Sequence, residues 1–312
     1  MNIFGKLLKD IRIFNNYTQK DLAAKLSIES EEFSQIDLVT ISRWERGMTS
    51  PNNAKALRVL RCLTKDVRPF LSSLMGHQCS RSLDDFVQQR FGTNIIQSTL
   101  AAFGVQVPTN RENFRHDKLI KKVNDPILKE IREYHSLFNQ DRLDLLNIDL
   151  YLYQEEKKLH GYRFYEETKP EKTIGNSLYF FMNTEDIEKE VKTNGCDIDL
   201  RKSVRYRESN YLSMYLASGV ITSAELFKYH WTHNLEFLST HSNIVNLYVS
   251  VLAESVVPFL MNIGFDVVAT KNPIFAGGVK IGRRHYERCV MKIDTSVLLT
   301  SKEALSLIAS RL

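Results

Sequence analysis

The sequence lacks the features that would place it in a membrane or in an oxidising compartment. Its 312 residues contain no apolar run of about 18, the length that a transmembrane helix needs. The N-terminus has neither the basic start nor the long apolar stretch of a signal peptide. Its four cysteines, Cys62, Cys79, Cys196 and Cys289, form no C-x-x-C pair, which argues against a zinc site or a disulfide framework. We therefore expect a cytoplasmic protein with no membrane association.

The sequence also lacks internal repeats and low-complexity tracts. With 43% hydrophobic and 25% charged residues, the composition is that of a globular protein with a sizeable core. The net charge of +5 permits a polyanionic partner without requiring one. The length predicts roughly two domains.

We divide the chain into an all-helical domain at residues 1–70, a helical connector and linker at 71–124, and a mixed α/β domain at 125–312. Within the connector we expect helices at Leu83–Phe91 and Ile95–Phe103. The polar stretch Pro108–Asp117 is the best linker candidate, because it is charged and poor in large apolar residues.

The N-terminal domain carries clear helix signals. Phe4–Asn15 has one apolar stripe at helical spacing. Thr18, with Asp21 three positions on, predicts a capped helix over Gln19–Leu26. Asp37 precedes a second capped helix, Leu38–Arg46, which Gly47 ends.

Together these segments resemble the helix-turn-helix of the Cro and phage-repressor class, the XRE family. The resemblance rests on Thr18-Gln-x-x-Leu-Ala-x-x-Leu26, Thr40-Ile-Ser-Arg-Trp-Glu-Arg-Gly47 and Ser50-Pro51, and it spans about residues 3–65. It implies that Leu38–Arg46 is a recognition helix in the major groove of DNA. It also implies a partly buried ion pair between Arg12 and Glu45.

Nine residues are candidates for contact with DNA. Arg43 can make a bidentate contact to guanine, and Leu38 or Val39 can touch a thymine methyl group. Other side chains would position the protein at the phosphates. The full set is Gln19, Leu38, Val39, Thr40, Ser42, Arg43, Arg46, Thr49 and Asn52. One departure from the family is the acidic stretch Glu29–Ile36, which adds about eight residues between the two helices.

The C-terminal part mixes strand and helix signals. We expect a β-hairpin at residues 148–165, a strand at 177–182, mainly helix over Tyr211–Tyr229, a strand at 244–251, a helix at Ser255–Ile263, and strands near 266–269 and 289–293. The tyrosines and phenylalanines of this half are expected to be core residues.

No catalytic motif stands out there. The sequence has no G-x-S-x-G, P-loop or dinucleotide-binding glycine pattern. His230 and His233 could face the same side of a helix, but we expect them to be a core or solvated pair rather than metal ligands. The glycine-rich segment Ala276–Arg284 is expected to be a plain turn, because no capped helix follows it.

The order of elements over residues 127–297 resembles a GNAT acyltransferase fold. The tightest match is Ser255–Val268. The departures bear on catalysis, because Leu260 stands where the family often has a general-acid tyrosine and Ala253 where it commonly has an asparagine. The glycine turn with which the family binds acyl-CoA is not found between Ser177 and Tyr229.

The sequence therefore favours a sequence-specific DNA-binding transcriptional regulator, with an N-terminal helix-turn-helix and a C-terminal α/β domain for sensing or dimerisation. On this interpretation the protein is not an enzyme, has no catalytic or metal-binding residues, and acts as a homodimer on a DNA operator under a small-molecule effector. No cofactor is expected, with acetyl-CoA the one candidate. The alternative is an active GNAT-type acyltransferase that carries a DNA-binding domain. A third hypothesis makes the N-terminal helices a protein-interaction module.

Overall fold

The computed structural model describes residues 3–75, 80–92, 114–137, 145 and 147–309. The chain divides into two compact units, and both are discontinuous in sequence. Unit 1 contains residues 1–79, 233–243 and 295–312, and unit 2 contains residues 80–232 and 244–294. The predicted boundaries at residues 70 and 125 therefore differ from the observed ones, because segments far along the chain complete the N-terminal helices.

Unit 1 is helical. Its elements are α1 (Ile3–Phe14), α2 (Gln19–Glu29), a 3-10 turn η1 (Glu31–Phe33), α3 (Leu38–Glu45), α4 (Asn53–Arg61), α5 (Arg68–Leu74), the end of α12 (Ala224–Thr240), α14 (Thr295–Leu299) and α15 (Lys302–Ala309). The predicted caps are present. Thr18 and Asp21 form a reciprocal capping box, and the Asp37 carboxylate accepts from the Thr40 amide at 2.7 Å.

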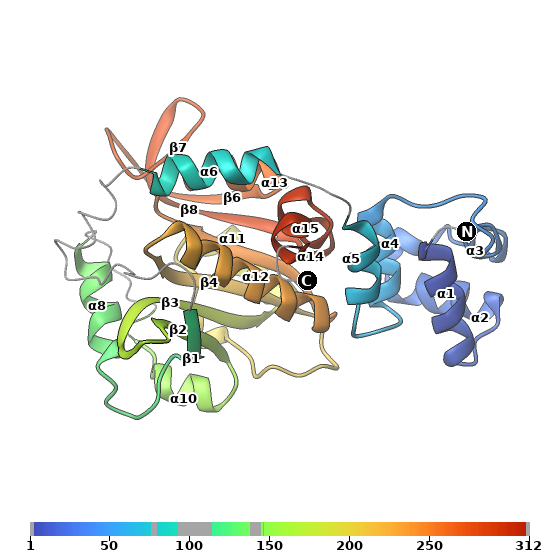
Figure 1. Cartoon of the computed structure of the whole chain (residues 1–312), viewed down its shortest axis with the longest axis horizontal. Coiled ribbons are helices and arrows are strands. Elements are labelled where there is room, and N and C mark those ends of the chain that lie inside the picture. The colour runs from blue at the N-terminus through green and yellow to red at the C-terminus, as the bar shows by residue number, and fades with distance from the viewer. Residues whose placement is uncertain (1–2, 76–79, 93–113, 138–144, 146, 310–312) are drawn as a thin grey trace. The chain divides into compact units, whose positions relative to one another are not determined.

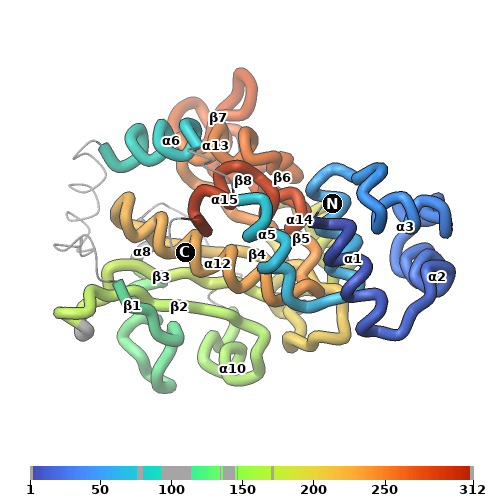
Figure 2. Tube along the Cα trace, turned by 45° about the vertical axis from the view of Figure 1, so that its right-hand side comes forward, coloured from blue at the N-terminus to red at the C-terminus, as the bar shows by residue number. Residues whose placement is uncertain are grey.

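The C-terminal helices of unit 1 pack against its N-terminal ones. α14 contacts α4, and α15 contacts α5, an arrangement that the trace in Figure 2 makes visible. Arg61 donates from Nε to the Ser242 carbonyl at 3.1 Å, and the Val67 amide donates to the Ser239 carbonyl at 3.1 Å. Segments from later in the chain therefore help to bury the helices of residues 3–75.

Unit 2 is built on one mixed sheet. Its strands are β1 (Phe114–Lys118), β2 (Leu159–Glu166), β3 (Lys169–Asn183), β4 (Leu212–Ile221), β5 (Ile244–Val251), β6 (Asp266–Ile274), β7 (Val279–Ile281) and β8 (Arg284–Asp294). The order is β1-β2-β3-β4-β5-β8-β6, with β7 paired to β8 outside this path. Only β4 and β5 pair in parallel, and all other neighbours among the described strands are antiparallel.

Helices cover both faces of this sheet. Along one face lies a large apolar cluster to which α8 (Ile127–Leu137), α10 (Leu150–Glu155) and α11 (Thr184–Asn194) contribute. The opposite face carries α12, whose Leu226 packs on Phe114, Phe164 and Ile174, and Figure 1 shows α12 crossing the strands. α6 (Arg81–Phe91) packs on α13 (Val256–Ile263). The predicted mixed α/β architecture of the C-terminal part is confirmed.

Several predicted elements are wrong. Residues 150–155 form helix α10 rather than the first strand of a hairpin, because the Asp149 side chain caps the amide of Leu152 at 3.0 Å. Residues 212–221 form strand β4 rather than helix. This strand is buried on both faces, so its apolar residues do not alternate with polar ones.

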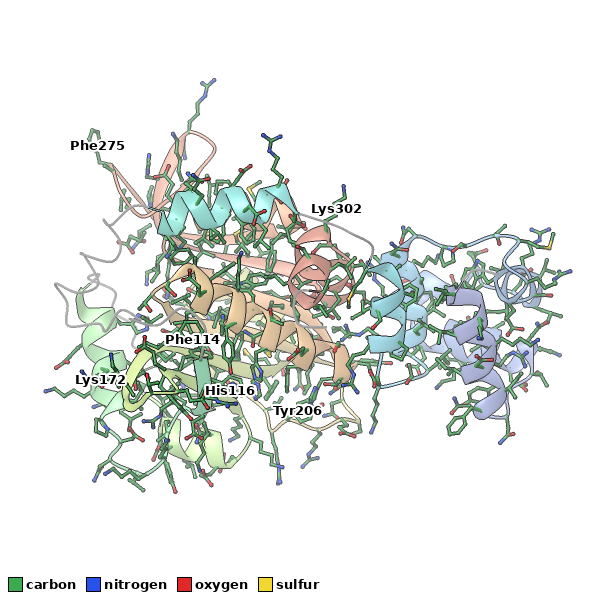
Figure 3. The ribbon with its side chains drawn as sticks, viewed as in Figure 1. Phe114, His116, Lys172, Tyr206, Phe275 and Lys302 are labelled. Atoms are coloured by element: carbon green, nitrogen blue, oxygen red, sulfur yellow. The ribbon has the colours of Figure 1, made fainter. Side chains whose placement is uncertain are left out.

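The linker prediction is also corrected in part. Its last residues, Phe114–Asp117, belong to strand β1, whose mostly exposed or half-buried side chains gave no apolar signal. The predicted helix at Leu83–Phe91 is confirmed as part of α6. The predicted helix at 95–103 lies outside the described residues. The segment 276–284 contains a tight turn with Gly277, Gly278 and Gly282 at positive φ, and Phe275 beside it points into solvent (Figure 3).

Candidate active site

The two parallel strands separate part of the way along their length. The register between β4 and β5 begins at Leu212 with Ile244 and ends at Leu216 with Val249, whereas β4 continues to Ile221. The cause is a β-bulge in β4. Leu178 of β3 pairs with Ser218 and Tyr179 pairs with Leu216, so Ala217 has no partner residue on β3. A bulge bends its strand. We call the resulting gap between β4 and β5 the fork.

The fork lies at the carboxyl ends of two parallel strands. In open α/β sheets ligands bind outside the carboxyl ends of parallel strands, and β4 and β5 are the parallel pair among the described strands. Strand edges that stop pairing also present backbone donors and acceptors, which need partners when they are buried. The fork is therefore our candidate position in unit 2 for an extended ligand with amide groups.

A buried serine–histidine pair lies beside the fork. Ser218 is the residue that follows the bulge, and its Oγ lies 2.9 Å from Nε2 of His135 on α8. Both residues are almost completely buried, with exposed fractions of 5% and 4%. A hydroxyl and an imidazole at this distance have the geometry of a nucleophile with its general base. No sequence motif links these two residues, which are 83 positions apart.

Other polar groups lie on the same face of the sheet. Asn176 is two residues from Leu178 on β3, and its Oδ1 is buried without a hydrogen-bond partner. The side chains of Tyr215 and Tyr248 are neighbours across the parallel pair, and both are fully buried. Burial raises the pKa of Tyr248, although Lys292 opposes this effect. An unsatisfied buried amide oxygen is costly in a core, so Asn176 marks this face as a place where a ligand N–H group would be accepted.

The helix that follows β4 does not carry a glycine turn for phosphate. Only Thr222 and Ser223 connect β4 to α12. The Thr222 hydroxyl donates to the Ile174 carbonyl at 2.8 Å, and the Ser223 hydroxyl accepts from the Leu226 amide at 3.1 Å. Glu225 adds a negative charge in the first turn. The connection between β4 and α12 therefore contains no glycine.

Aromatic rings fill the space between α12 and α13. Phe86 of α6 stacks on Phe259 of α13, with ring centroids 4.0 Å apart, and lies 5.2 Å from Phe227 of α12. Arg90 donates to the Ser255 hydroxyl at 3.1 Å, at the start of α13. α6 thus covers the region where α12 and α13 begin. A ligand that approaches the fork from this face would have to displace α6.

Two positions of chemical interest in the sequence are core positions. Leu260 is buried in α13 with 1% of its surface exposed. His230 is a core residue whose Nε2 lies 3.1 Å from the Tyr179 hydroxyl. Among the described residues no group of three or more His, Cys, Asp or Glu is placed to hold a metal ion, and no helix is long and apolar enough to cross a membrane.

In unit 1 the nine predicted DNA-contact residues lie at the surface, exposed or half-buried. Four of them already have side-chain partners. Gln19 Nε2 donates to Glu45 at 2.7 Å, and Asn52 Oδ1 accepts from the Lys55 amide at 2.8 Å, capping α4. Arg46 Nε donates to the Ser42 carbonyl at 3.2 Å, and a hydrogen bond from the Thr40 side chain lowers the pKa of Asp37. That they contact DNA stays a prediction.

The ion pair that the helix-turn-helix resemblance implies is present. Arg12 donates to Glu45 from Nε at 2.5 Å and from Nη2 at 3.0 Å. The hydrogen bond to Glu45 raises the pKa of Arg12 despite the opposing effect of burial. The inserted segment after α2 is anchored rather than loose, because Phe33 and Ile36 are buried.

A surface groove of about 630 Å³ lies beside these elements. It is formed where α1 ends and where α2 and α3 begin. Its lining residues are Arg12, Ile13, Asn16, Tyr17, Thr18, Gln19, Lys20 and Leu38. Two of the predicted DNA contacts, Gln19 and Leu38, line it.

Comparison with known proteins gives structural neighbours only. No protein-family model matches the sequence, and no curated protein matches it. Solved structures that match include Arabidopsis thaliana NAA60 in complex with acetyl-CoA (10% identity, TM-score 0.36, 58% of this chain and 98% of that one). A probable acetyltransferase from Staphylococcus epidermidis matches at 14% identity and a TM-score of 0.35, over 58% of this chain and 99% of that one. Spermidine N-acetyltransferase from Vibrio cholerae, in complex with CoA and spermine, matches at 15% identity and a TM-score of 0.33, over 60% of this chain and 98% of that one.

These neighbours contradict the main functional prediction from the sequence. The prediction was a DNA-binding regulator without enzyme activity, and the structures found are those of acetyltransferases or hold acetyl-CoA or CoA. The helix-turn-helix resemblance led to the DNA-binding part of that prediction, and Leu260 with the missing glycine turn led to the part without enzyme activity. At these identities and TM-scores the likeness assigns no activity to this chain. Any activity has to be argued from the geometry of the fork.

Proposed function

We propose that this chain is an acyltransferase that takes its acyl group from a thioester bound at the fork, and that its N-terminal helices dock on double-stranded DNA. The observation that carries the first part is the fork itself, with the Ser218–His135 pair beside it. A carbonyl group placed at the bulge would meet both a hydroxyl and an imidazole within hydrogen-bond reach of each other.

Acetyl-CoA is the donor that we propose to test. The residues present fit its acyl-pantetheine arm, since the arm carries amide groups that can pair with the separated strand edges and Asn176 Oδ1 can accept an N–H group. The nucleotide end finds no glycine turn at α12. When bound, the thioester supplies an activated acyl group, and the residues of the fork bind and orient it. We expect the arm rather than the nucleotide to provide most of the affinity.

Calorimetric titration with acetyl-CoA tests the donor. We expect binding in the micromolar range, and a similar affinity for S-acetyl-N-acetylcysteamine, which keeps the thioester and one amide but has no nucleotide. Substitution of Phe275, which is fully exposed, by Ala is the matched control and should change neither value. If the purified protein binds neither thioester and releases no thiol from either, the acyltransferase proposal is wrong.

The DNA-docking part is supported by the resemblance of α1–α4 to the phage-repressor helices and by the Arg12–Glu45 pair. Arg43 is exposed on α3, so it is free to reach a base edge. Arg43→Ala should cost about 1–3 kcal/mol of binding to a selected site and relax specificity at one base pair. Selection from random duplexes followed by titration at several salt concentrations measures both. Equal binding of selected and scrambled duplexes by the parent protein and the variant would contradict this assignment.

A further inference from the structure

The buried Ser218–His135 pair at the bulge can do more than orient a substrate. We infer that Ser218 is an acyl carrier: it accepts the acyl group from the thioester and passes it to the acceptor, with His135 as the base. This inference rests on the proposed acyltransferase function. It differs from direct transfer between donor and acceptor, in which no protein atom becomes acylated.

The geometry brings an imidazole nitrogen to the serine hydroxyl, which is the contact that activates a serine. Nε2 of His135 lies 2.9 Å from the Ser218 hydroxyl, so in the tautomer that carries its proton on Nδ1 the imidazole accepts the hydroxyl proton. Both side chains are more than nine-tenths buried. A serine is a weak nucleophile at its ordinary pKa and becomes effective only beside a base of this kind.

The position of Ser218 gives it access to the donor. It is the first residue after the bulge at Ala217, and the pairing of β4 with β5 has ended two residues before it. A thioester that enters the fork therefore reaches the face of the sheet on which Ser218 and His135 meet. The unpartnered Oδ1 of Asn176 lies on the same face and can accept an N–H group of the donor arm.

The reaction balances without a further reactant. The Ser218 oxygen bonds to the thioester carbonyl carbon while its proton passes to His135 Nε2. The carbon–sulfur bond then breaks, and the departing thiolate takes the proton from Nε2 to leave as a thiol. In the second step an amine attacks the serine ester, and the Ser218 oxygen leaves and recovers a proton through His135. The product is an amide, and the enzyme returns to its starting state.

Burial makes the intermediate observable. Because Ser218 is almost completely buried, hydrolysis of the ester should be slow, and the ester should accumulate when a thioester is supplied without an acceptor amine. A rapid release of thiol, stoichiometric with the protein, is the kinetic signature of such an acyl-enzyme. After trypsin digestion the peptide of residues 208–228 should carry the mass of one acetyl group, and fragmentation should locate it on Ser218.

The experiment uses the full chain and acetyl-CoA as the probe. Ser218→Ala should abolish both the thiol burst and the acetylated peptide while leaving acetyl-CoA binding within about threefold. His135→Gln keeps a similar shape without a basic nitrogen, so the burst should slow by about 100-fold or more. Ser218→Cys replaces the oxygen ester by a thioester. Neutral hydroxylamine should then remove the acetyl group, whereas it leaves an ordinary serine ester intact. A purely structural Ser218 would not produce that change.

Three outcomes separate the two proposals. Acetylation of Ser218 that responds to these substitutions supports both. If acetyl-CoA binds and thiol is released but the peptide stays unmodified, transfer is direct, and the carrier role is overturned while the acyltransferase proposal stands. If acetyl-CoA neither binds nor loses its acetyl group, both are overturned. The fluorescence of Trp231, the tryptophan of unit 2, shows whether each variant has folded.

Discussion

Removal of Arg12 should destabilise unit 1 far more than the loss of an ordinary surface charge. Arg12 makes two hydrogen bonds to Glu45 and donates from Nη1 to the Tyr17 carbonyl at 2.9 Å. The Glu45 side chain is only 4% exposed, against 13% for Arg12. In Arg12→Met the buried carboxylate keeps Gln19 as its remaining donor in the structure. Breaking a buried ion pair costs about 3–5 kcal/mol, and because Gln19 remains we expect about 3 kcal/mol.

The double variant Arg12→Met with Glu45→Met separates loss of the pair from loss of packing. If the cost of the single variant comes from an unpaired buried carboxylate, removal of that carboxylate should restore stability to within about 1 kcal/mol of the parent. Each unit has one tryptophan, Trp44 in unit 1 and Trp231 in unit 2. Urea unfolding followed by Trp44 fluorescence in a Trp231→Phe background therefore reports on unit 1. A single variant within about 1 kcal/mol of the parent, or a double variant as unstable as the single, would refute the reasoning.

Three further substitutions or treatments test the packing. Inside a helix alanine is normally about 1 kcal/mol more stabilising than glycine. In Gly5→Ala, however, the new Cβ would lie 2.1 Å from the Trp44 carbonyl oxygen, so the urea midpoint of the Trp44 transition should fall. A higher midpoint would contradict the close approach of α1 and α3. Phe86→Ala removes the ring that joins α6 to α13. The free energy of unfolding of unit 2, followed by Trp231 fluorescence, should fall by about 3–5 kcal/mol. An unchanged midpoint would show that α6 is not packed there. Burial raises the pKa of Cys196 to about 11 and that of Cys289 to about 12. Iodoacetamide at neutral pH should therefore alkylate neither thiol until the protein is unfolded. Detection of either alkylated cysteine in the native protein by mass spectrometry would disprove this.

The sequence predicted an element correctly where the residues that define it are close together in the chain. The capping residues Thr18 and Asp37 each accept from the amide three positions on, so the sequence alone placed α2 and α3. β4 was missed because both of its faces are buried, which removes the alternation that identifies a strand. β1 was missed for the opposite reason, since it is short and mostly polar.

The candidate active site was not predictable in the same way. Ser218 and His135 are brought together by the register of β4 on β3 and by the packing of α8, and neither residue stands in a motif. The bulge at Ala217 is likewise defined only by its neighbours on β3. The sequence named Leu260 and the turn before α12, but it gave no sign of the bulge or of the buried pair beside it.

The discontinuous composition of unit 1 has a consequence for how the protein is made. The helices of residues 3–75 are synthesised well before their partners α14 (Thr295–Leu299) and α15 (Lys302–Ala309). The partner of the Val67 amide, Ser239, also comes late. During most of translation these early helices therefore lack the surfaces that bury their apolar side chains. We expect them to become protease-resistant only after α14 and α15 have been synthesised, so unit 1 should fold after the sheet of unit 2 has been translated.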